Sequence, residues 1–190
     1  MRKNQILFGG ALLLFIVAFL LDDAVVNLMP LIQNNYLTYI MVWFTHSWST
    51  FFVLIFLTSL FLWTEKKKKW IPLLLISIFF GVFFSYLIKF IIARPRPLGF
   101  EKYFFSIKDY SFPSSHATIS FAAVAVLDRV FCLLKWFWLC FALVVSFSRL
   151  YFNYHYLSDV VSGIFLGYFI GRTILIMVNK NAHLKRIFGN

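Results

Sequence analysis

Three short polar clusters interrupt a sequence that is otherwise strongly apolar. They are Lys89 with Arg96-Pro97, the run Pro113–His116, and Ser148-Arg149 with His155 and Asp159. Together they carry cations, imidazoles, serine hydroxyls and a carboxylate, which are groups that bind a phosphate and can accept its phosphorus on a histidine nitrogen. Charged side chains among apolar segments are costly to place, so we interpret these clusters as a functional site.

The cations of the clusters match the needs of phosphoryl transfer. The transferred group spreads negative charge over its oxygens, so catalysis depends mostly on positioning and electrostatic stabilisation. Arg96 and Arg149 offer planar bidentate donors, and Lys89 adds a point charge. A lone cation at a helix end is more often a snorkelling residue. Three cations beside two histidines favour the phosphate site instead.

The third cluster contains a histidine and a carboxylate. His155 and Asp159 are four residues apart, which places them on one face of a helix. A carboxylate that keeps one imidazole nitrogen protonated leaves the other free as a base or nucleophile. The alternative is a helix-capping pair, because Asp159 lies near the start of the last apolar segment.

The second cluster directly precedes another apolar segment. Ser114 or Ser115 is predicted to cap the helix that follows, whose first backbone N–H groups then face an anion. His116 is suited to protonate a departing alkoxide or phosphate. An ordinary helix cap without a catalytic role is the alternative.

The elements that carry these clusters are predicted to be membrane helices. The chain has 190 residues, of which 62% are hydrophobic and only 13% charged, unlike a soluble domain. Six apolar segments can be bounded, at residues 6–21, 48–63, 70–92, 117–134, 136–147 and 160–178. The first ends without a small-residue cleavage site, so we expect an uncleaved transmembrane helix rather than a signal peptide.

The stretch 22–47 lies between the first two apolar segments, and its apolar part at Tyr36–Phe44 is too short for a further span. Its apolar residues fit one buried side, so we expect a short interfacial helix there. The predicted fold is therefore all-α: a polytopic membrane protein with six transmembrane helices, in a single domain over residues 1–190 with its motifs within 89–159.

The basic residues predict the orientation of the chain. Twelve of the 18 Lys and Arg, among them Arg2, Lys3 and the run Lys66–Lys69, fall on one side if six spans alternate. That side is cytoplasmic by the positive-inside rule. Both termini are then cytoplasmic, and the three clusters face the outside of the cytoplasmic membrane. The net charge of +11 thus reflects orientation, and we expect no nucleic-acid binding.

Neither a disulfide nor a metal centre is predicted. Cys132 and Cys140 lie in apolar runs without CxxC spacing, so we expect buried, reduced thiols. His46 and His183 stand apart from the clusters, and no metal-ligand spacing is visible. We therefore expect neither a metal nor a cofactor.

Taken in order, the clusters resemble the motifs of the type 2 phosphatidic acid phosphatase superfamily. Those motifs are Lys-x6-Arg-Pro, Pro-Ser-Gly-His and Ser-Arg-x5-His-x3-Asp, matched here by Lys89–Pro97, Pro113–His116 and Ser148–Asp159. The resemblance implies that His155 is the nucleophile, that Asp159 is its partner, and that His116 protonates the leaving group. The groups implied to hold the phosphate are Lys89, Arg96, Ser114, Arg149 and the Ser115 backbone.

One position departs from the motifs, since Ser115 stands where the family usually has glycine. A Cβ there shifts the backbone N–H relative to the phosphate, which we expect to tune the site rather than inactivate it.

A compact chain of this kind is most similar to the bacterial lipid phosphatases of the superfamily. The implied function is a metal-independent phosphatase acting on a lipid phosphate or diphosphate. Arg94, Lys102 and Lys108 add cations beside the site, which favours lipid A 1-phosphate or undecaprenyl diphosphate. Phosphatidylglycerol phosphate and phosphatidic acid are alternative substrates. A lipid-to-lipid phosphotransferase and a non-catalytic lipid-binding or transport protein also stay open, as does the oligomeric state.

Overall fold

The chain folds into a bundle of helices with a small β-hairpin. The computed structural model describes residues 2–63, 67–99, 103–104, 107–131, 134–181 and 184. Its helices are α1 (Arg2–Leu20), α2 (Asp22–Ile32), α3 (Asn35–Thr45), α4 (Ser47–Phe51), α5 (Thr58–Leu62), α6 (Trp70–Ile92), α7 (Ser115–Val130), α8 (Lys135–Tyr151) and α9 (Leu157–Lys180). A π-helical stretch (Phe52–Leu57) joins α4 to α5, and a 3₁₀ turn (Pro97–Gly99) follows α6. Strands β1 (Tyr103–Phe104) and β2 (Ile107–Lys108) pair antiparallel. Apart from this hairpin, the all-α prediction is confirmed.

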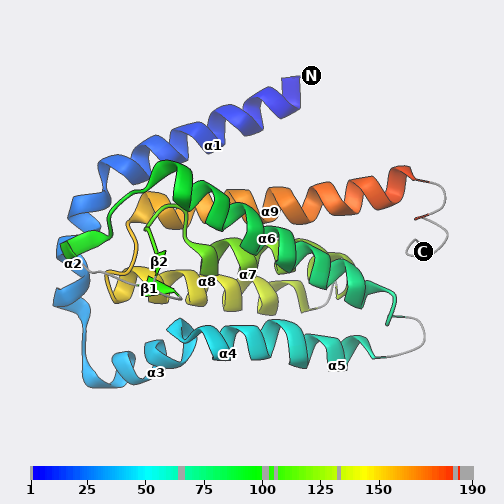
Figure 1. Cartoon of the computed structure of the whole chain (residues 1–190), viewed down its shortest axis with the longest axis horizontal. Helices are drawn as coiled ribbons and strands as arrows, with labels where there is room; N and C mark the ends of the chain where they lie inside the picture. The colour runs from blue at the N-terminus through cyan, green and yellow to red at the C-terminus, as the bar shows by residue number, and fades with distance from the viewer. Residues whose placement is uncertain are drawn as a thin grey trace.

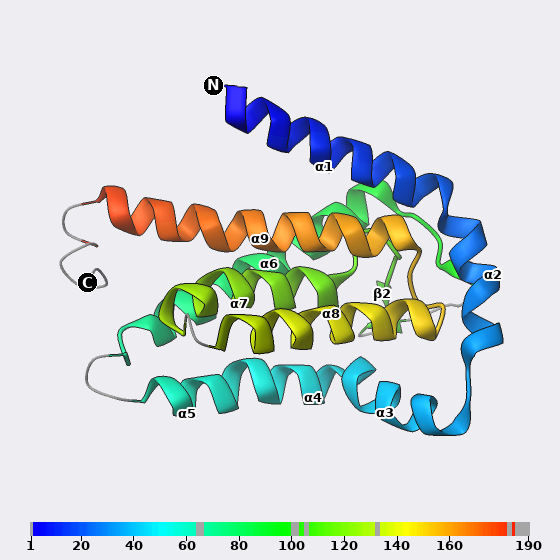
Figure 2. The same cartoon turned by 180° about the vertical axis from the view of Figure 1, so that it is seen from behind.

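Helix α7 lies at the centre of the bundle. Helices α6, α8 and α9 pack against it and run alongside it (Figures 1 and 2). Every residue of α7 from Ala117 to Leu127 is buried. A helix enclosed by its neighbours buries its whole surface rather than a single stripe. Outside this group, α1 packs against α9 and α3 packs against α8.

Small residues allow α9 to approach α7 closely. Gly163, Gly167 and Gly171 follow one another at four-residue intervals on α9. A Cβ at Gly163 would lie 2.7 Å from the backbone oxygen of Ser114, and one at Gly171 would lie 2.6 Å from that of Ala122. At Gly167 a Cβ would also meet the α7 backbone. Such backbone contact at small residues is typical of helix pairs in membranes.

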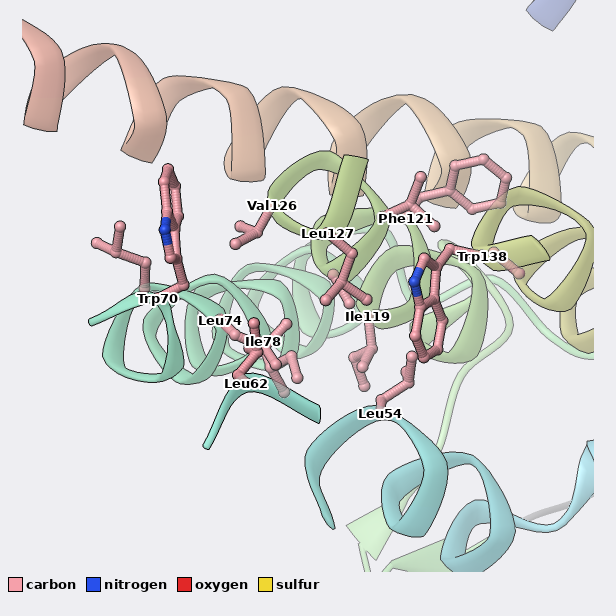
Figure 3. Packing of buried hydrophobic residues seen from close by; sticks show 14 of the residues in the cluster. Leu54, Leu62, Trp70, Leu74, Ile78, Ile119, Phe121, Val126, Leu127 and Trp138 are labelled. Carbon is pink, nitrogen blue, oxygen red and sulfur yellow. The ribbon is translucent and has the colours of Figure 1, made fainter. Parts of the chain in front are cut away.

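The main apolar core has the continuous helical segment from α4 to α5 on one side. Helices α6, α7 and α8 lie on the other side (Figure 3). Its most deeply buried members include Leu54, Leu62, Leu73, Leu74, Val126, Leu127 and Trp138. Because lipid chains are as apolar as these side chains, close packing is what favours helix association in a membrane.

The structure supports fewer membrane spans than the sequence predicts. Of the described residues, only α6 and α9 form single helices that are long and apolar enough to cross a membrane. Two bent pairs, at 9–32 and 35–62, also qualify if each counts as one span, with bends of 62° and 60°. Helices α7 and α8 have 16 and 17 residues, below the roughly 20 that a span needs. The prediction of six spans is therefore not confirmed.

The stretch 22–47 contains two helices, α2 and α3, where one interfacial helix was predicted. They are separated by Gln33 and Asn34, whose backbones are extended. The side chain of Asn34 accepts a hydrogen bond from the N–H of Leu37 over 2.9 Å, which caps α3 and ends the continuity of the helix. The prediction of a single helix is wrong for this reason.

One cysteine prediction is also wrong. Cys140 is a free thiol, as predicted, but it is exposed on α8 rather than buried. Cys132 lies outside the described residues.

The two ends of the bundle differ in character. Helix α9 ends and α6 begins at one end of the bundle (Figure 1). Helix α2 and the β-hairpin lie at the opposite end, where α6 and α8 finish and α7 and α9 begin. The residues of the three polar clusters lie in the terminal turns of those four helices or in the adjoining loops, so the fold gathers them at one end of the molecule.

Candidate active site

The three polar clusters meet around one cavity. It has a volume of about 440 Å³ and lies among α4, α6, α7 and the loops that follow α6 and α8. The predicted site residues in its lining are Lys89, Arg96, Ser115, His116, Arg149 and His155. Ser114 and Asp159 are fully buried next to these residues but are not part of the lining.

His155 lies in the turn between α8 and α9. Asn153 in this turn adopts a left-handed conformation with a φ of 52°. The turn brings Nδ1 of His155 to 3.5 Å from Oδ2 of Asp159, and both side chains are buried. The prediction that the two residues share one helical face is wrong for His155, because α9 begins only at Leu157. They meet across the start of the helix.

The carboxylate of Asp159 caps helix α9, which is the alternative role that the sequence suggested, and it also lies beside His155. Its Oδ2 accepts a hydrogen bond from the backbone N–H of Tyr156 over 2.9 Å, which caps the start of α9. The same oxygen accepts a hydrogen bond from the hydroxyl of Ser111. The cap therefore holds the carboxylate in place beside the imidazole of His155.

The surroundings of His155 define its protonation. Nη1 of Arg96 lies 3.3 Å from Nε2 of His155, and a guanidinium can only donate. Nε2 therefore carries the lone pair, and the proton is on Nδ1. Burial, followed by the charges of Arg96, Lys89 and Arg149, holds the pKa of His155 well below its usual 6.5. The imidazole is thus neutral at neutral pH, with its unprotonated Nε2 facing Arg96.

Lys89 and Arg96 share a carboxylate that the motifs do not include. Asp109 lies 3.0 Å from Nζ of Lys89 and 2.9 Å from Nη2 of Arg96. Its backbone oxygen also accepts a hydrogen bond from Nε of Arg96 over 2.9 Å. Helix α6 ends before Ala93, which is left-handed with a φ of 50°, and prolines on both sides restrict Arg96. Both cations therefore converge on one point beside His155.

Arg149 enters the cavity from the last turn of α8. Its Nη1 donates to the backbone oxygen and the hydroxyl of Thr45, over 2.8 and 2.5 Å. Its guanidinium lies 4.8 Å from the ring centroid of Tyr154. Its Nε finds no partner among the described residues, although the residue is only 2% exposed. A buried donor without a partner is costly, so this N–H is suited to a phosphate oxygen.

Ser114 occupies the N-cap position of α7 without capping it through its side chain. No capping bond forms, and its hydroxyl has no partner among the described residues. The prediction of a side-chain cap at Ser114 is thus wrong. The backbone N–H of Ser114 instead donates to the backbone oxygen of Asp159 over 3.0 Å. This bond joins the second motif to the third.

Ser115 and His116 form the first turn of α7 and line the cavity. The positive end of the helix dipole therefore faces the space where an anion would bind. The hydroxyl of Ser115 accepts a hydrogen bond from Ser85 over 3.2 Å. Nε2 of His116 lies 3.2 Å from the hydroxyl of Ser47 at the start of α4.

The rest of the cavity lining is mainly apolar, with Phe51, Val82, Tyr86, Phe90 and Ile119 beside the polar groups. A polar end next to apolar walls suits a ligand with a phosphate head and a hydrocarbon chain. Among the described residues, no three His, Cys, Asp or Glu side chains gather in a way that would hold a metal ion.

Comparison with known proteins identifies the family. The sequence matches the PAP2 superfamily over residues 70–183, which is more than half of the chain. The chain belongs to the PAP2 superfamily. This membership confirms the resemblance inferred from the three motifs.

Relatives of this PAP2 protein are known in sequence and in structure. It is 29% identical over 172 residues to an undecaprenyl-diphosphatase of Sulfolobus acidocaldarius, covering 85% of this chain and 82% of that protein. A PAP2-type phosphatidylglycerolphosphate phosphatase from Bacillus subtilis shares the fold with a TM-score of 0.72 at 21% identity, covering 95% of this chain and 98% of that one. LpxE of Aquifex aeolicus also shares the fold, with a TM-score of 0.68 at 21% identity. The match covers 82% of this chain and 95% of LpxE. We conclude that the protein is a membrane phosphatase of lipid phosphates.

Some residues at the PAP2 site do not follow from the sequence patterns. Asp109 and Ser111 lie between the first two motifs, in a segment without periodicity. Thr45 and Ser47 precede the family match, at the break between α3 and α4. The sequence signal for Thr45 and Ser47 was their polarity within a largely apolar stretch. The prediction of one interfacial helix did not take this polarity into account.

Proposed function

We propose that this protein removes the terminal phosphate from a lipid diphosphate or lipid phosphate through a phosphohistidine at His155. The observation that supports this most directly is the neutral Nε2 of His155, which lies beside Arg96 in a cavity with one cationic and one apolar end. We place the reaction at the extracytoplasmic face of the cytoplasmic membrane, because the basic turn Lys67–Lys69 before α6 lies at the other end of the bundle from the helix ends that carry the motifs (Figure 1).

In the first step, Nε2 of His155 attacks the phosphorus and the bond from phosphorus to the leaving oxygen breaks. His116 donates its proton to that oxygen, which leaves as a lipid alcohol or lipid phosphate. The cations Lys89, Arg96 and Arg149 stabilise the charge on the equatorial oxygens. Asp159 stabilises the positive charge that develops on the imidazole, whose Nδ1 stays protonated.

In the second step, a water molecule attacks the phosphorus of the phosphohistidine. His116, now neutral, accepts a proton from the water, and the bond between phosphorus and Nε2 breaks. Inorganic phosphate leaves, and both histidines return to their starting states. Ser114 and the start of α7 are proposed to bind the phosphate oxygens throughout.

Among possible substrates, we favour a polyprenyl diphosphate such as undecaprenyl diphosphate. Support comes from the relative at 29% identity, whose similarity extends over most of both chains. Lipid A 1-phosphate, phosphatidylglycerol phosphate and phosphatidic acid present the same kind of head group, and the likeness to the Bacillus subtilis enzyme at 21% identity concerns the fold alone.

A substrate panel tests this proposal. Purified protein is supplied with the four lipids in detergent, with a chelator and no added metal, and inorganic phosphate is measured. We expect the fastest release from the polyprenyl diphosphate, inhibition by vanadate, and no release by His155→Ala. The matched control is His46→Gln, since His46 is exposed and does not line the cavity.

The panel also separates the other functions. Equal rates for the wild type and His155→Ala would refute the hydrolase and leave a lipid-binding or transport protein. Labelled lipid product in place of free phosphate, with an acceptor lipid present, would indicate a phosphotransferase. Faster release from another lipid would replace the proposed substrate.

A further inference from the structure

Arg94 contacts the carboxylate beside His155, although it lies outside the lining of the cavity. Its Nη1 donates to Oδ1 of Asp159 and to the hydroxyl of Ser158, each over 2.7 Å. Its guanidinium also lies over the ring of Tyr156, 3.9 Å from the centroid. Arg94 therefore binds the one oxygen of Asp159 that the cap and Ser111 leave available.

Asp22 binds the other side of the same guanidinium. Its Oδ2 lies 2.7 Å from Nη2 of Arg94. Its two oxygens also accept hydrogen bonds from the backbone N–H and the hydroxyl of Ser158, over 2.8 and 2.6 Å. Asp22 is the first residue of α2, is 4% exposed, and lies before the region that matches the family. Charged contacts thus run from Asp22 through Arg94 and Asp159 to His155.

We propose that Arg94 and Asp22 are positioning residues for the phosphoryl-transfer step. They fix the orientation and the charge of Asp159, and through it the imidazole of His155. This inference rests on the proposed function, in which His155 becomes phosphorylated and its imidazole becomes cationic.

The electrostatics of the buried carboxylate explain why two residues are needed. Asp159 is fully buried, and a buried carboxylate requires a charged or hydrogen-bonded partner. Arg94 supplies that charge. Alone, however, it would also cancel the negative potential that stabilises the imidazolium. Asp22 offsets the charge of Arg94, so that Asp159 keeps its influence on His155.

Arg94 is a permanent cation in this arrangement. Burial works against its charge, but the hydrogen bond to Asp22 and the charge of Asp159 together raise the pKa of Arg94 above its ordinary value. The guanidinium of Arg94 therefore keeps its positive charge beside Asp159.

A purely structural role for the same contacts makes a different prediction. If they only anchor α2 to the start of α9, removing them lowers the fraction of folded protein but not the turnover of each folded site. If they position Asp159, kcat per folded site falls. The affinity for phosphate is then unchanged, because Lys89, Arg96 and Arg149 are intact.

The experiment compares Asp22→Asn, Arg94→Ala and the matched control Asp23→Asn, whose side chain is exposed on the same turn of α2. It measures kcat, KM and the inhibition constant of inorganic phosphate in detergent-purified protein, normalised to the folded fraction. We expect kcat to fall about 10-fold in Asp22→Asn and about 100-fold in Arg94→Ala. KM and the inhibition constant should stay within about twofold, and added methylguanidinium should partly restore Arg94→Ala only.

The inference is overturned if Asp22→Asn keeps the kcat of Asp23→Asn, or if Arg94→Ala loses phosphate affinity in parallel with kcat and is not rescued. Should Arg94→Ala fail to fold, the isosteric Asp22→Asn decides. A parallel assay of His155→Ala distinguishes failure of the proposed function from failure of the positioning role. Full activity of that variant refutes the proposed function, whereas an inactive His155→Ala with an unchanged Asp22→Asn refutes the positioning role alone.

Discussion

At the scale of single residues, Asp109 places a carboxylate against two of the cations that are proposed to bind the phosphate. It contacts both Lys89 and Arg96, at 3.0 and 2.9 Å. A phosphate that enters the cavity must share these two cations with Asp109 or displace it. The carboxylate also keeps the two cations close together before substrate arrives, which reduces their mutual repulsion.

We predict that Asp109→Asn binds inorganic phosphate about 3- to 10-fold more tightly, because a neutral amide no longer competes for the cations. The measurement is the inhibition constant of phosphate against lipid hydrolysis. Asp128→Asn is the control, since Asp128 pairs with Lys135 at the other end of the bundle. Weaker phosphate binding by Asp109→Asn would mean that this carboxylate organises the cations rather than competing with substrate.

The lowered pKa of His155 gives a second prediction at this scale. An exposed histidine is half protonated near pH 6.5, but burial and the neighbouring cations disfavour the charged form of His155. We therefore expect its imidazole to stay neutral, with the proton on Nδ1, when the pH falls from 7.5 to 6. Arg96→Gln should raise the pKa of the His155 imidazole towards 6.5.

The titration can be followed by ¹⁵N NMR of histidine-labelled protein, with the signal assigned by its loss in His155→Gln. Half protonation of His155 at pH 6.5 or above in the wild type would contradict the electrostatic account of the site.

Some site residues could be predicted from the sequence and others could not, for a physical reason. Fixed spacings within the motifs identify Lys89, His116 and His155 from the sequence alone. Asp109 and Asp22 follow no spacing, because their distance along the chain from their partners depends on a hairpin and on the path of α2. Long-range contacts of that kind are fixed by the fold.

At the scale of elements, the closeness of α7 and α9 determines the geometry of the site. The start of α7 carries Ser115 and His116, and the turn before α9 carries His155. The glycines on α9 allow the two backbones to touch, so the distance between the second and third motifs depends on them. Their four-residue spacing is visible in the sequence, but spacing alone does not identify the helix that packs against them.

We predict that Gly167→Ala destabilises the protein by about 1–3 kcal/mol, because its Cβ would overlap the α7 backbone. It should also lower kcat, since α9 carries Asp159. Thermal unfolding in detergent and lipid hydrolysis measure the two effects. Gly9→Ala is the control, since no atom lies within 4 Å of a Cβ at Gly9. Equal stability of the two variants would show that α7 and α9 have room to separate.

Helix breaks were predicted less well than helix interiors. The interiors of α6 and α9 follow from long apolar runs, which periodic patterns identify well. The break at Gln33–Asn34 depends on one side-chain cap, and the bend between α3 and α4 contributes Thr45 and Ser47 to the site. One or two polar residues carry too little sequence signal to distinguish a helix break from a continuous helix.

At the scale of the whole molecule, the basic turn Lys67–Lys69 before α6 lies at one end of the bundle, and the ends of α6 and α8 that carry Lys89 and Arg149 lie at the other (Figure 2). An excess of Lys and Arg marks the cytoplasmic side of membrane proteins. The arrangement therefore predicts that the cavity opens on the extracytoplasmic side, where lipid diphosphates can reach it from the membrane.

We expect cysteine labelling to confirm this orientation. In a background with Cys132→Ser and Cys140→Ser, Tyr36→Cys at the start of α3 should react with a membrane-impermeant maleimide in intact cells. Lys68→Cys, in the turn before α6, should react only after the membrane is opened. The reverse pattern would place the site in the cytoplasm.

The most direct test of the central claim is to detect phosphate on His155 during turnover. The wild-type protein is mixed with labelled polyprenyl diphosphate, quenched within milliseconds at alkaline pH, where phosphohistidine survives, and digested for mass spectrometry. We predict a transient phosphate on the peptide that contains His155, and none in His155→Ala. Rapid hydrolysis by the wild type with no phosphate on His155 at any time point would contradict the account.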